Sequence, residues 1–210
     1  ASTLRENDFR VCVKGRMSGD RFQCMEICAP ENTGMYGCAI DIGTTTVTMV
    51  IADLTSGKIL AKGSSGNGQI RYGADVINRI IEQGKPGGKK KLQDAIVKET
   101  LTPILAGLCK SASLDPRSIL SLCVGANTTM NHLFVGVDAQ SVRMEPYIPS
   151  FFHWEGLLAG DVKLPANPLA PVQIAPNIGS YVGGDITAGT LASGIWDRDE
   201  MSLFIDLGTN

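Results

Sequence analysis

Residues 39–45 read AIDIGTT, and residues 203–210 read LFIDLGTN. Both stretches run from bulky apolar residues to Asp, one further apolar residue, Gly and Thr, so that Asp41 and Asp206 occupy equivalent places. An apolar run of this kind predicts a buried strand, and the glycine after it permits a tight turn that a Cβ would obstruct. We therefore expect two strand-and-turn units, each directing a carboxylate out of a strand end.

The chemistry that suits these turns is phosphate binding. Consecutive backbone N–H groups and threonine hydroxyls form an anion-binding nest, and two such turns facing each other bracket a polyphosphate with its Mg²⁺ ion. Mg²⁺ keeps several of its waters, so we expect Asp41 and Asp206 to bind the metal through water. A single Asp-x-Gly-Thr is equally well explained as a strand end, but the second copy favours a site. The glycine spacing of a Walker motif is absent from TSGKIL and GKPGGKKK.

The composition is that of an ordinary globular protein, with 43% hydrophobic and 19% charged residues. A formal charge of −2 does not support binding to nucleic acid or to an anionic membrane. The sequence contains no apolar run of the roughly 20 residues that span a bilayer, and its start has neither a signal-peptide core nor an initiator Met. The six scattered cysteines do not form a disulfide scaffold. We expect a cytoplasmic protein, here as a processed or excised piece.

Periodicity predicts alternating strands and helices. Apolar residues Val76, Ile77, Ile80 and Ile81 share one face of a helix that ends at Gly84. The expected strands are 35–43, 45–54, 58–65, 119–126 and 202–208, after a hairpin at 9–28, and the expected helices are 72–84, 91–110 with a bend at Pro103, 128–136 and 184–195. The proline-rich and aromatic stretch 142–176 is expected to be an irregular insertion. This order predicts an α/β fold with a mixed sheet.

DIGTTT at 41–46 and DLGTN at 206–210 resemble the two phosphate motifs of the actin, heat-shock chaperone and acetate and sugar kinase superfamily. In that superfamily two similar lobes with a ribonuclease H-like sheet close on ATP. The resemblance implies that 37–202 is the first lobe, that 203–210 opens a second lobe that is otherwise missing, and that 1–36 is a separate hairpin and linker. It also implies a set of residues that contact the nucleotide phosphates: Gly43, Thr44, Thr45 and Thr46 on one side, and Gly208, Thr209 and Asn210 on the other.

Three longer stretches are similar to the ATPase domain of reductive activators of corrinoid proteins: NGQIRYGADVINRI (67–80), GANTTMNHLFVGVD (125–138) and IAPNIGSYVGGDITAGTLASGI (174–195). In that family an ATP-driven cycle lets an iron-sulfur domain return an oxidised cobalt(II) corrinoid protein to cobalt(I). The resemblance implies ATP and Mg²⁺ as cofactors, a corrinoid methyl-transfer protein as partner, and an iron-sulfur cluster elsewhere in the full-length protein. The chain departs from the family in having no ferredoxin cysteine cluster, and in having Gly68 where the family pattern has Pro.

The resemblance also implies roles at the last helix. Asp185 matches an acidic residue that orients the attacking water, so Asp185 and Asp206 are the candidate catalytic residues, although a helix cap explains Asp185 nearly as well. Gly183 and Gly184 would let the backbone approach the nucleotide, or would belong to an ordinary loop. Asn127, with the two threonines after it, either faces the nucleotide or caps a helix.

Several alternatives remain open at this point. A small-molecule kinase would need a substrate pocket with an Asp base, and a dehydratase activator would need a bridging cluster that the cysteine spacings do not provide. A non-catalytic binding module is a third possibility, and a homodimer is compatible with all of them. The cysteines at 12, 24, 28 and 38 are interpreted as structural, and His132 and His153 as helix-surface or loop residues. The aromatics at 147–154 either form an interaction surface or pack onto the lobe.

Overall fold

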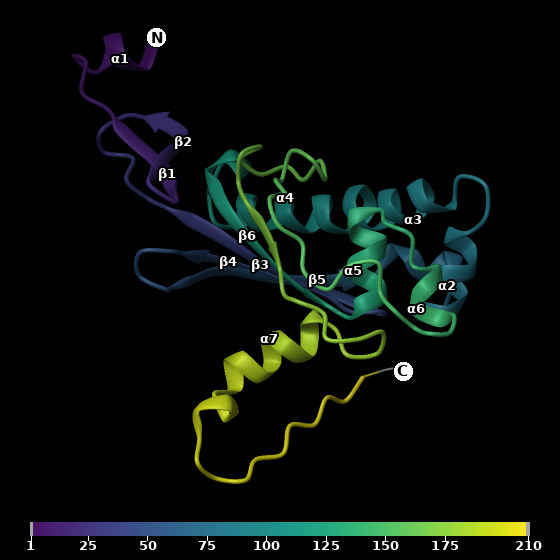
Figure 1. The fold of residues 1–210 in the computed structure, drawn as a ribbon. Coiled ribbons are helices and arrows are strands. Elements are labelled where there is room, and N and C mark those ends of the chain that lie inside the picture. Colours follow the sequence, from purple (N-terminus) through teal and green to yellow (C-terminus); the bar gives the residue numbers. More distant parts are fainter. Residues whose placement is uncertain (1, 209–210) are drawn as a thin grey trace.

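The computed structural model describes residues 2–208, which form two β-sheets with helices around the larger one (Figure 1). The smaller sheet is an antiparallel hairpin of β1 (Cys12–Ser18) and β2 (Arg21–Cys28), preceded by the short helix α1 (Ser2–Glu6). Gly19 lies in the hairpin turn with φ of +61°, a backbone conformation that glycine adopts at no steric cost. The hairpin predicted at 9–28 is therefore present.

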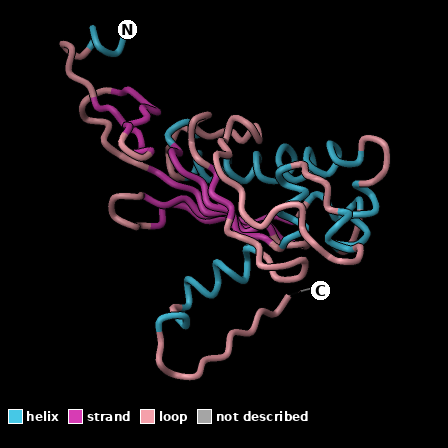
Figure 2. Tube along the Cα trace, in the orientation of Figure 1, coloured by secondary structure: helices cyan, strands magenta, loops and turns pink. Residues whose placement is uncertain are grey.

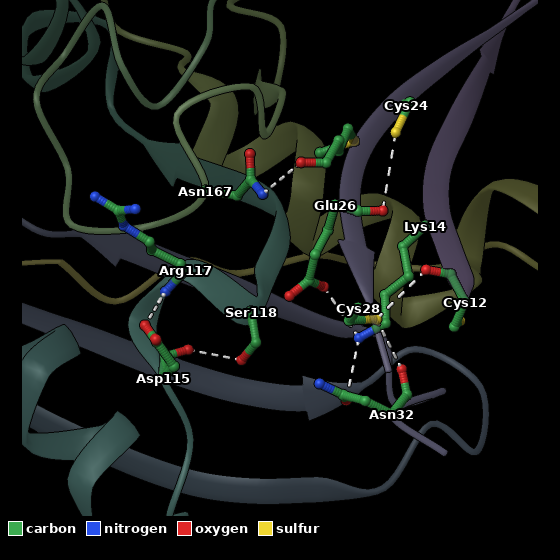
Figure 3. Close-up of polar contacts among 11 residues, drawn as sticks. Cys12, Lys14, Cys24, Glu26, Cys28, Asn32, Asp115, Arg117, Ser118 and Asn167 are labelled. Carbon is green, nitrogen blue, oxygen red and sulfur yellow. Dashed lines mark hydrogen bonds and ion pairs between the residues drawn. The ribbon is translucent and has the colours of Figure 1, made fainter. Parts of the chain in front are cut away.

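The hairpin is held by buried polar contacts at its base (Figure 3). The Lys14 ammonium, only 2% exposed as a side chain, pairs with Glu26 at 3.0 Å and donates to Asn32 Oδ1 at 3.3 Å. The Cys28 thiol donates to the Asn32 carbonyl at 3.2 Å, and burial raises the pKa of this thiol. Asn167 ties the hairpin to the rest of the chain by donating to the Met25 carbonyl at 3.2 Å. The buried Cys28 thiol thus has a structural place at the base of the hairpin, as predicted for this cysteine.

The larger sheet has five strands in the order β5-β4-β3-β6-β7. Figure 2 shows strands of this sheet running side by side, with helices next to them. The first three pair antiparallel, whereas β6 and β7 continue parallel to β3. The strands are β3 (Tyr36–Ile42), β4 (Thr46–Asp53), β5 (Ile59–Gly66), β6 (Ile119–Ala126) and β7 (Val172–Ile174). The predicted α/β class with a mixed sheet is confirmed. Because β3 and β6 are parallel, their carboxyl ends meet at one edge of the sheet, at Ile42 and Ala126.

Helices cover one face of this sheet, and a single long helix crosses the other (Figure 1). Gly63 of β5 faces Leu108 on the first side, whereas Gly125 of β6 faces Ala188 of α7 on the second. The helical segments are η1 (Gly68–Tyr72), α2 (Val76–Gln83), α3 (Gly88–Ile96), η2 (Val97–Leu101), α4 (Thr102–Ser111), η3 (Pro116–Ser118), α5 (Thr128–Val135), α6 (Gln140–Arg143), α7 (Gly184–Ser193) and η4 (Ile195–Asp197). Among residues 2–208 no helix is both long and apolar enough to span a membrane.

The core lies between the sheet and the layer of α3 and α4. Ile40, Met49 and Val124 are neighbours across β3, β4 and β6, and none is more than 2% exposed. Leu101 and Leu105 close the core from the helical side and are fully buried. Truncating one such leucine to alanine typically costs about 2–5 kcal/mol. This packing fixes β3, and with it the strand end that carries Asp41.

The helix predicted at 91–110 is divided by a wider helical segment just before Pro103, where the sequence predicts a bend. η2 forms a π-helix between α3 and α4, and Pro103 stands in the first turn of α4. The Thr100 and Thr102 hydroxyls donate to the carbonyls of Ala95 and Val97, each at 2.8 Å. Pro103 has no N–H to donate to the preceding turn, and the two hydroxyls add side-chain hydrogen bonds to carbonyls at the start of the wide segment.

Two predictions about the second half of the chain are corrected. The stretch 142–176 is irregular as expected, but it also supplies β7 and buried core residues including Leu157, Leu164 and Val172. The strand predicted at 202–208 does not form, and residues 201–208 are exposed and without regular secondary structure. A strand needs a neighbour for its backbone hydrogen bonds. This segment instead runs back along α7, where Phe204 packs against Gly189 (Figure 1).

Candidate phosphate-binding site

The turn 43–46 connects β3 to β4 at the edge where β3 and β6 both end. The Gly43 N–H donates to the Thr46 carbonyl at 3.0 Å and closes the turn. A Cβ at Gly43 would lie 2.6 Å from that same oxygen, so the turn requires glycine for close approach. Thr44 is buried, whereas Thr45 and Thr46 are exposed. The reason given for Gly43 from the sequence is therefore confirmed.

The carbonyls of this turn are held from inside. The Gly43 carbonyl accepts from Asn67 Nδ2 at 2.9 Å, and the Thr44 carbonyl accepts from Arg79 Nη2. Asn67 Nδ2 and Arg79 Nη1 both also contact the Met130 sulfur, so the two carbonyls point to the same interior side. In a trans peptide the N–H points opposite to the C=O. The N–H groups of Thr44 and Thr45 are thus both directed away from the interior, which is the geometry of an anion nest.

Three carboxylates gather near this turn. Asp41 is paired with Gly125 in the β3–β6 register, and the Gly184 carbonyl at the start of α7 lies 3.9 Å from an ideal Cβ on Gly125. Desolvation raises the pKa of Asp41, and the negative charges of Asp185 and then Asp206 raise it further. The pKa of Asp185 is raised by desolvation and by Asp206, against the N–H of Ile186 that donates to it at 2.9 Å. A cation bound among these carboxylates would relieve the repulsion between their negative charges.

Among the described residues no three His, Cys, Asp or Glu side chains form a ready-made metal cage. The carboxylates nevertheless fit a hydrated Mg²⁺ ion, which binds proteins through one or two carboxylates, waters and substrate phosphates. Gly208 lies in the exposed segment beyond Asp206. Thr209 and Asn210, the remaining candidates for the second phosphate turn, lie outside the described residues. Their assignment stays a prediction.

Gly183 and Gly184 have a structural explanation. A Cβ on Gly183 would lie 2.5 Å from both Asn127 Cα and the Thr128 nitrogen, and one on Gly184 would lie 2.3 Å from the Ala175 carbonyl oxygen. The two glycines let the start of α7 press against the start of α5 and the end of β7. This close approach is between protein segments and brings Asp185 to the strand ends, whereas an approach to the nucleotide stays a prediction.

Asn127 connects the turn to α5. Its side-chain oxygen caps the helix by accepting from the Met130 N–H at 2.9 Å, and its Nδ2 donates to Thr44 Oγ1 at 3.1 Å. Thr128 is fully buried and donates to the Gly179 carbonyl at 2.6 Å. Both open interpretations of Asn127 are thus compatible with its place, because it caps the helix and also touches the turn 43–46.

His132 is not a surface residue, so that prediction is wrong. It is fully buried, and its ring stacks on Phe151 with centroids 4.4 Å apart. Nε2 accepts from the Ser150 N–H at 3.0 Å, so Nδ1 carries the proton and donates to the Thr128 carbonyl at 2.7 Å. Burial lowers the pKa of this neutral ring. His153, in contrast, is exposed beside Glu155, as expected.

Asn67 and Arg79 are the site residues that sequence reasoning missed. The apolar face of α2 was expected to be Val76, Ile77, Ile80 and Ile81, but Ile77 is 38% and Ile81 44% exposed. The buried residues are Arg79, Ile80 and Gln83. Arg79 and Gln83 are spaced three and seven residues from Val76, which is the helical spacing of a buried face. This spacing could have predicted that Arg79 is buried, but a charged residue is not expected on a buried helix face.

The aromatic residues of 147–154 divide into two groups. Phe151 stacks on His132 and meets Trp154 edge-on at 5.1 Å, whereas Tyr147 and Phe152 are 48% and 46% exposed. A cavity of about 490 Å³ lies beside Trp154, between β6, β7 and α7, with a largely apolar lining. The turn 43–46 does not line this cavity. The described residues thus bear out the packing interpretation for Phe151 and Trp154, and leave the interface prediction for the exposed pair untested.

The fold and the site define a class of α/β protein in which a glycine turn at the end of a central strand presents its amides beside acidic side chains. A family model described as the RACo middle region matches residues 36–198. The chain therefore belongs to the RACo family, which confirms the resemblance to reductive activators of corrinoid proteins.

Two relatives agree with this assignment. The corrinoid activation enzyme RamQ of Eubacterium limosum is 40% identical over 177 residues, which are 84% of this chain and 29% of RamQ. A solved structure of a reductive activator for corrinoid, iron-sulfur protein matches with a TM-score of 0.89 and 39% identity, over 99% of this chain and 33% of that one. The chain thus spans about a third of the length of these relatives.

Proposed function

We propose that this chain is the nucleotide-binding part of an ATP-dependent reductive activator that returns a cobalt(II) corrinoid protein to cobalt(I). The net change is the addition of one electron to cobalt, supplied by an iron-sulfur cluster in another part of the full-length protein and coupled to ATP hydrolysis. The observation that carries the proposal is the outward-facing Thr44 and Thr45 amides beside Asp41, in a chain whose relatives are named as corrinoid activators.

In this proposal each group near the turn has a part. Gly43, Thr44, Thr45 and Thr46 bind the β- and γ-phosphates, and Gly208, Thr209 and Asn210 approach from the other side. Asp41 and Asp206 hold waters of a Mg²⁺ ion, which neutralises phosphate charge when bound. Asp185, together with Asp206, orients the attacking water.

Gly183 and Gly184 lie beside the nucleotide and hold Asp185 in place. Closure of the protein on ATP then links the nucleotide state to docking of the corrinoid partner. The partner is a corrinoid methyl-transfer protein, a homodimer is compatible with the scheme, and the cytoplasm is the compartment in which the six free cysteines stay reduced.

The test uses the full-length protein with its corrinoid partner and a chemical electron donor. Cobalt(I) formation is followed by absorbance, with and without Mg·ATP, and phosphate release is measured in parallel. Asp41→Asn is expected to reduce ATP hydrolysis at least tenfold, which corresponds to about 1.4 kcal/mol of barrier. Asp199→Asn, an exposed acid after α7, is the matched control and should behave as wild type. Cobalt(I) formation that is fast without ATP, or wild-type hydrolysis by Asp41→Asn, would contradict the proposal.

A further inference from the structure

Arg79 lies directly behind the phosphate turn. Its side chain extends from α2 into the interior and is fully buried, with no exposed surface. Nε donates to the Gly73 carbonyl at 2.9 Å, Nη1 contacts Gln69 Oε1 at 3.4 Å and the Met130 sulfur at 3.2 Å, and Nη2 donates to the Thr44 carbonyl. One guanidinium thus joins η1, α5 and the turn.

All of these partners are neutral. Within residues 2–208, none of the ion pairs includes Arg79. Desolvation lowers the pKa of its guanidinium to about 10, against a smaller effect of Asp75, the half-buried cap of α2. Arg79 therefore stays charged at neutral pH. Burying a charge without a contacting counter-charge is costly, and an apolar residue of similar volume is often as stable or more so.

The direction of the Thr44 carbonyl indicates what the buried charge of Arg79 does. Because Arg79 Nη2 binds that oxygen, the Thr44–Thr45 peptide is oriented with its N–H on the opposite side, toward the space in front of the turn. A hydrogen bond to the carbonyl also polarises the amide and strengthens its N–H as a donor. In the low dielectric of the interior, a cation just behind the turn attracts an anion in front of it.

We propose that Arg79 is a positioning residue for nucleotide phosphates, which orients the Thr44–Thr45 peptide toward the anion and supplies positive potential from behind it. The inference rests on the proposed binding of ATP at this turn. If Arg79 has a purely structural role and only joins α2 to η1 and the turn, its replacement should change stability without changing the ratio of the affinities for ATP and AMP.

The test compares ATP with AMP, which shares the base, ribose and one phosphate but lacks the β- and γ-phosphates. Dissociation constants are measured on the full-length protein for wild type, Arg79→Met, Arg79→Lys and Arg71→Met. Arg71 is an exposed arginine on η1 that pairs with Glu99, so Arg71→Met removes the same charge from the surface. Circular dichroism and thermal unfolding establish that each variant is folded.

Arg79→Met is expected to weaken ATP binding by about tenfold or more while AMP binding changes by less than about twofold. Arg79→Lys keeps the charge but not the planar fork, and should weaken ATP binding several-fold. If Arg79→Met does not fold, Arg79→Lys alone tests the role of Arg79 in ATP binding. Arg71→Met should bind both nucleotides as wild type does.

Equal losses for ATP and AMP, or unchanged ATP affinity in a folded Arg79 variant, would overturn the role of Arg79 while leaving ATP binding intact. A wild-type protein with no affinity for Mg·ATP would instead overturn the proposed function together with this inference.

Discussion

Replacing Gly183 by alanine tests whether the junction of α5 and α7 builds the site. The new Cβ would lie 2.5 Å from Asn127 Cα and from the Thr128 nitrogen. Gly183 has φ of −101°, which any residue adopts, so the whole effect is steric. The obstructing atoms belong to the backbone and cannot rotate away, and an ordinary contact requires the two helix starts to separate by about 1 Å.

The expected cost follows from this geometry. Overpacking in a rigid region costs about 1–3 kcal/mol, and here the upper part of that range applies. The same shift stretches the Asn127 cap on Met130 and its bond to Thr44, adding about 1 kcal/mol. A total near 3 kcal/mol lowers the melting temperature by about 6–12 °C for a domain of this size.

Urea unfolding of the purified chain, monitored by circular dichroism, measures the stability, and ATP affinity is measured on the full-length variant. Gly107→Ala in α4 is the matched control, because a Cβ there meets no atom within 4 Å and alanine favours a helix interior by about 0.5–1 kcal/mol. We expect Gly183→Ala to lose both stability and ATP affinity, and Gly107→Ala to lose neither. A Gly183→Ala protein within about 0.5 kcal/mol of wild type would refute the junction as described.

Three further predictions concern titration and packing. The pKa of His132 is lowered in the folded state, so its contribution to stability is present above about pH 6.5 and is lost as the pH falls through the folded-state pKa. The urea midpoint should therefore drop from pH 7 to pH 5 in wild type and in His153→Gln, and a pH-independent midpoint would exclude this role. The pKa of Asp41 is raised, so its ionisation opposes folding, and Asp41→Asn should raise the melting temperature at pH 7, with the gain vanishing near pH 3. Phe151→Ala should destabilise the chain by about 3 kcal/mol and Phe152→Ala by less than about 0.5, and equal losses would contradict their different packing.

The central strands were predictable because their own residues specify them. β4 is rich in β-branched residues and alternates buried with less buried positions. The bounds of β6 were predicted to the residue from an apolar run between a turn and a helix cap. The Gly43 turn was predictable for a similar reason, since the requirement for glycine arises within four residues. Information that is local in sequence was sufficient for these elements.

The failures share a non-local cause. His132 was predicted at the surface and the burial of Arg79 was not predicted, because polar side chains are usually exposed. Backbone groups from distant segments, the Thr44 carbonyl for Arg79 and the Ser150 N–H for His132, make their burial possible. β7 was hidden in a proline-rich stretch, where pairing with β6 determines the strand. The predicted strand at 202–208 has the right residues but no pairing partner among the described ones.

The central claim is that nucleotide phosphates bind at the turn 43–46. Its most direct test is a crystal structure of the full-length protein with Mg²⁺ and a non-hydrolysable ATP analogue. The account predicts phosphate oxygens within about 3.2 Å of the Thr44 and Thr45 nitrogens, with a metal-bound water on Asp41. A nucleotide bound elsewhere, with this turn contacting no phosphate, would contradict it.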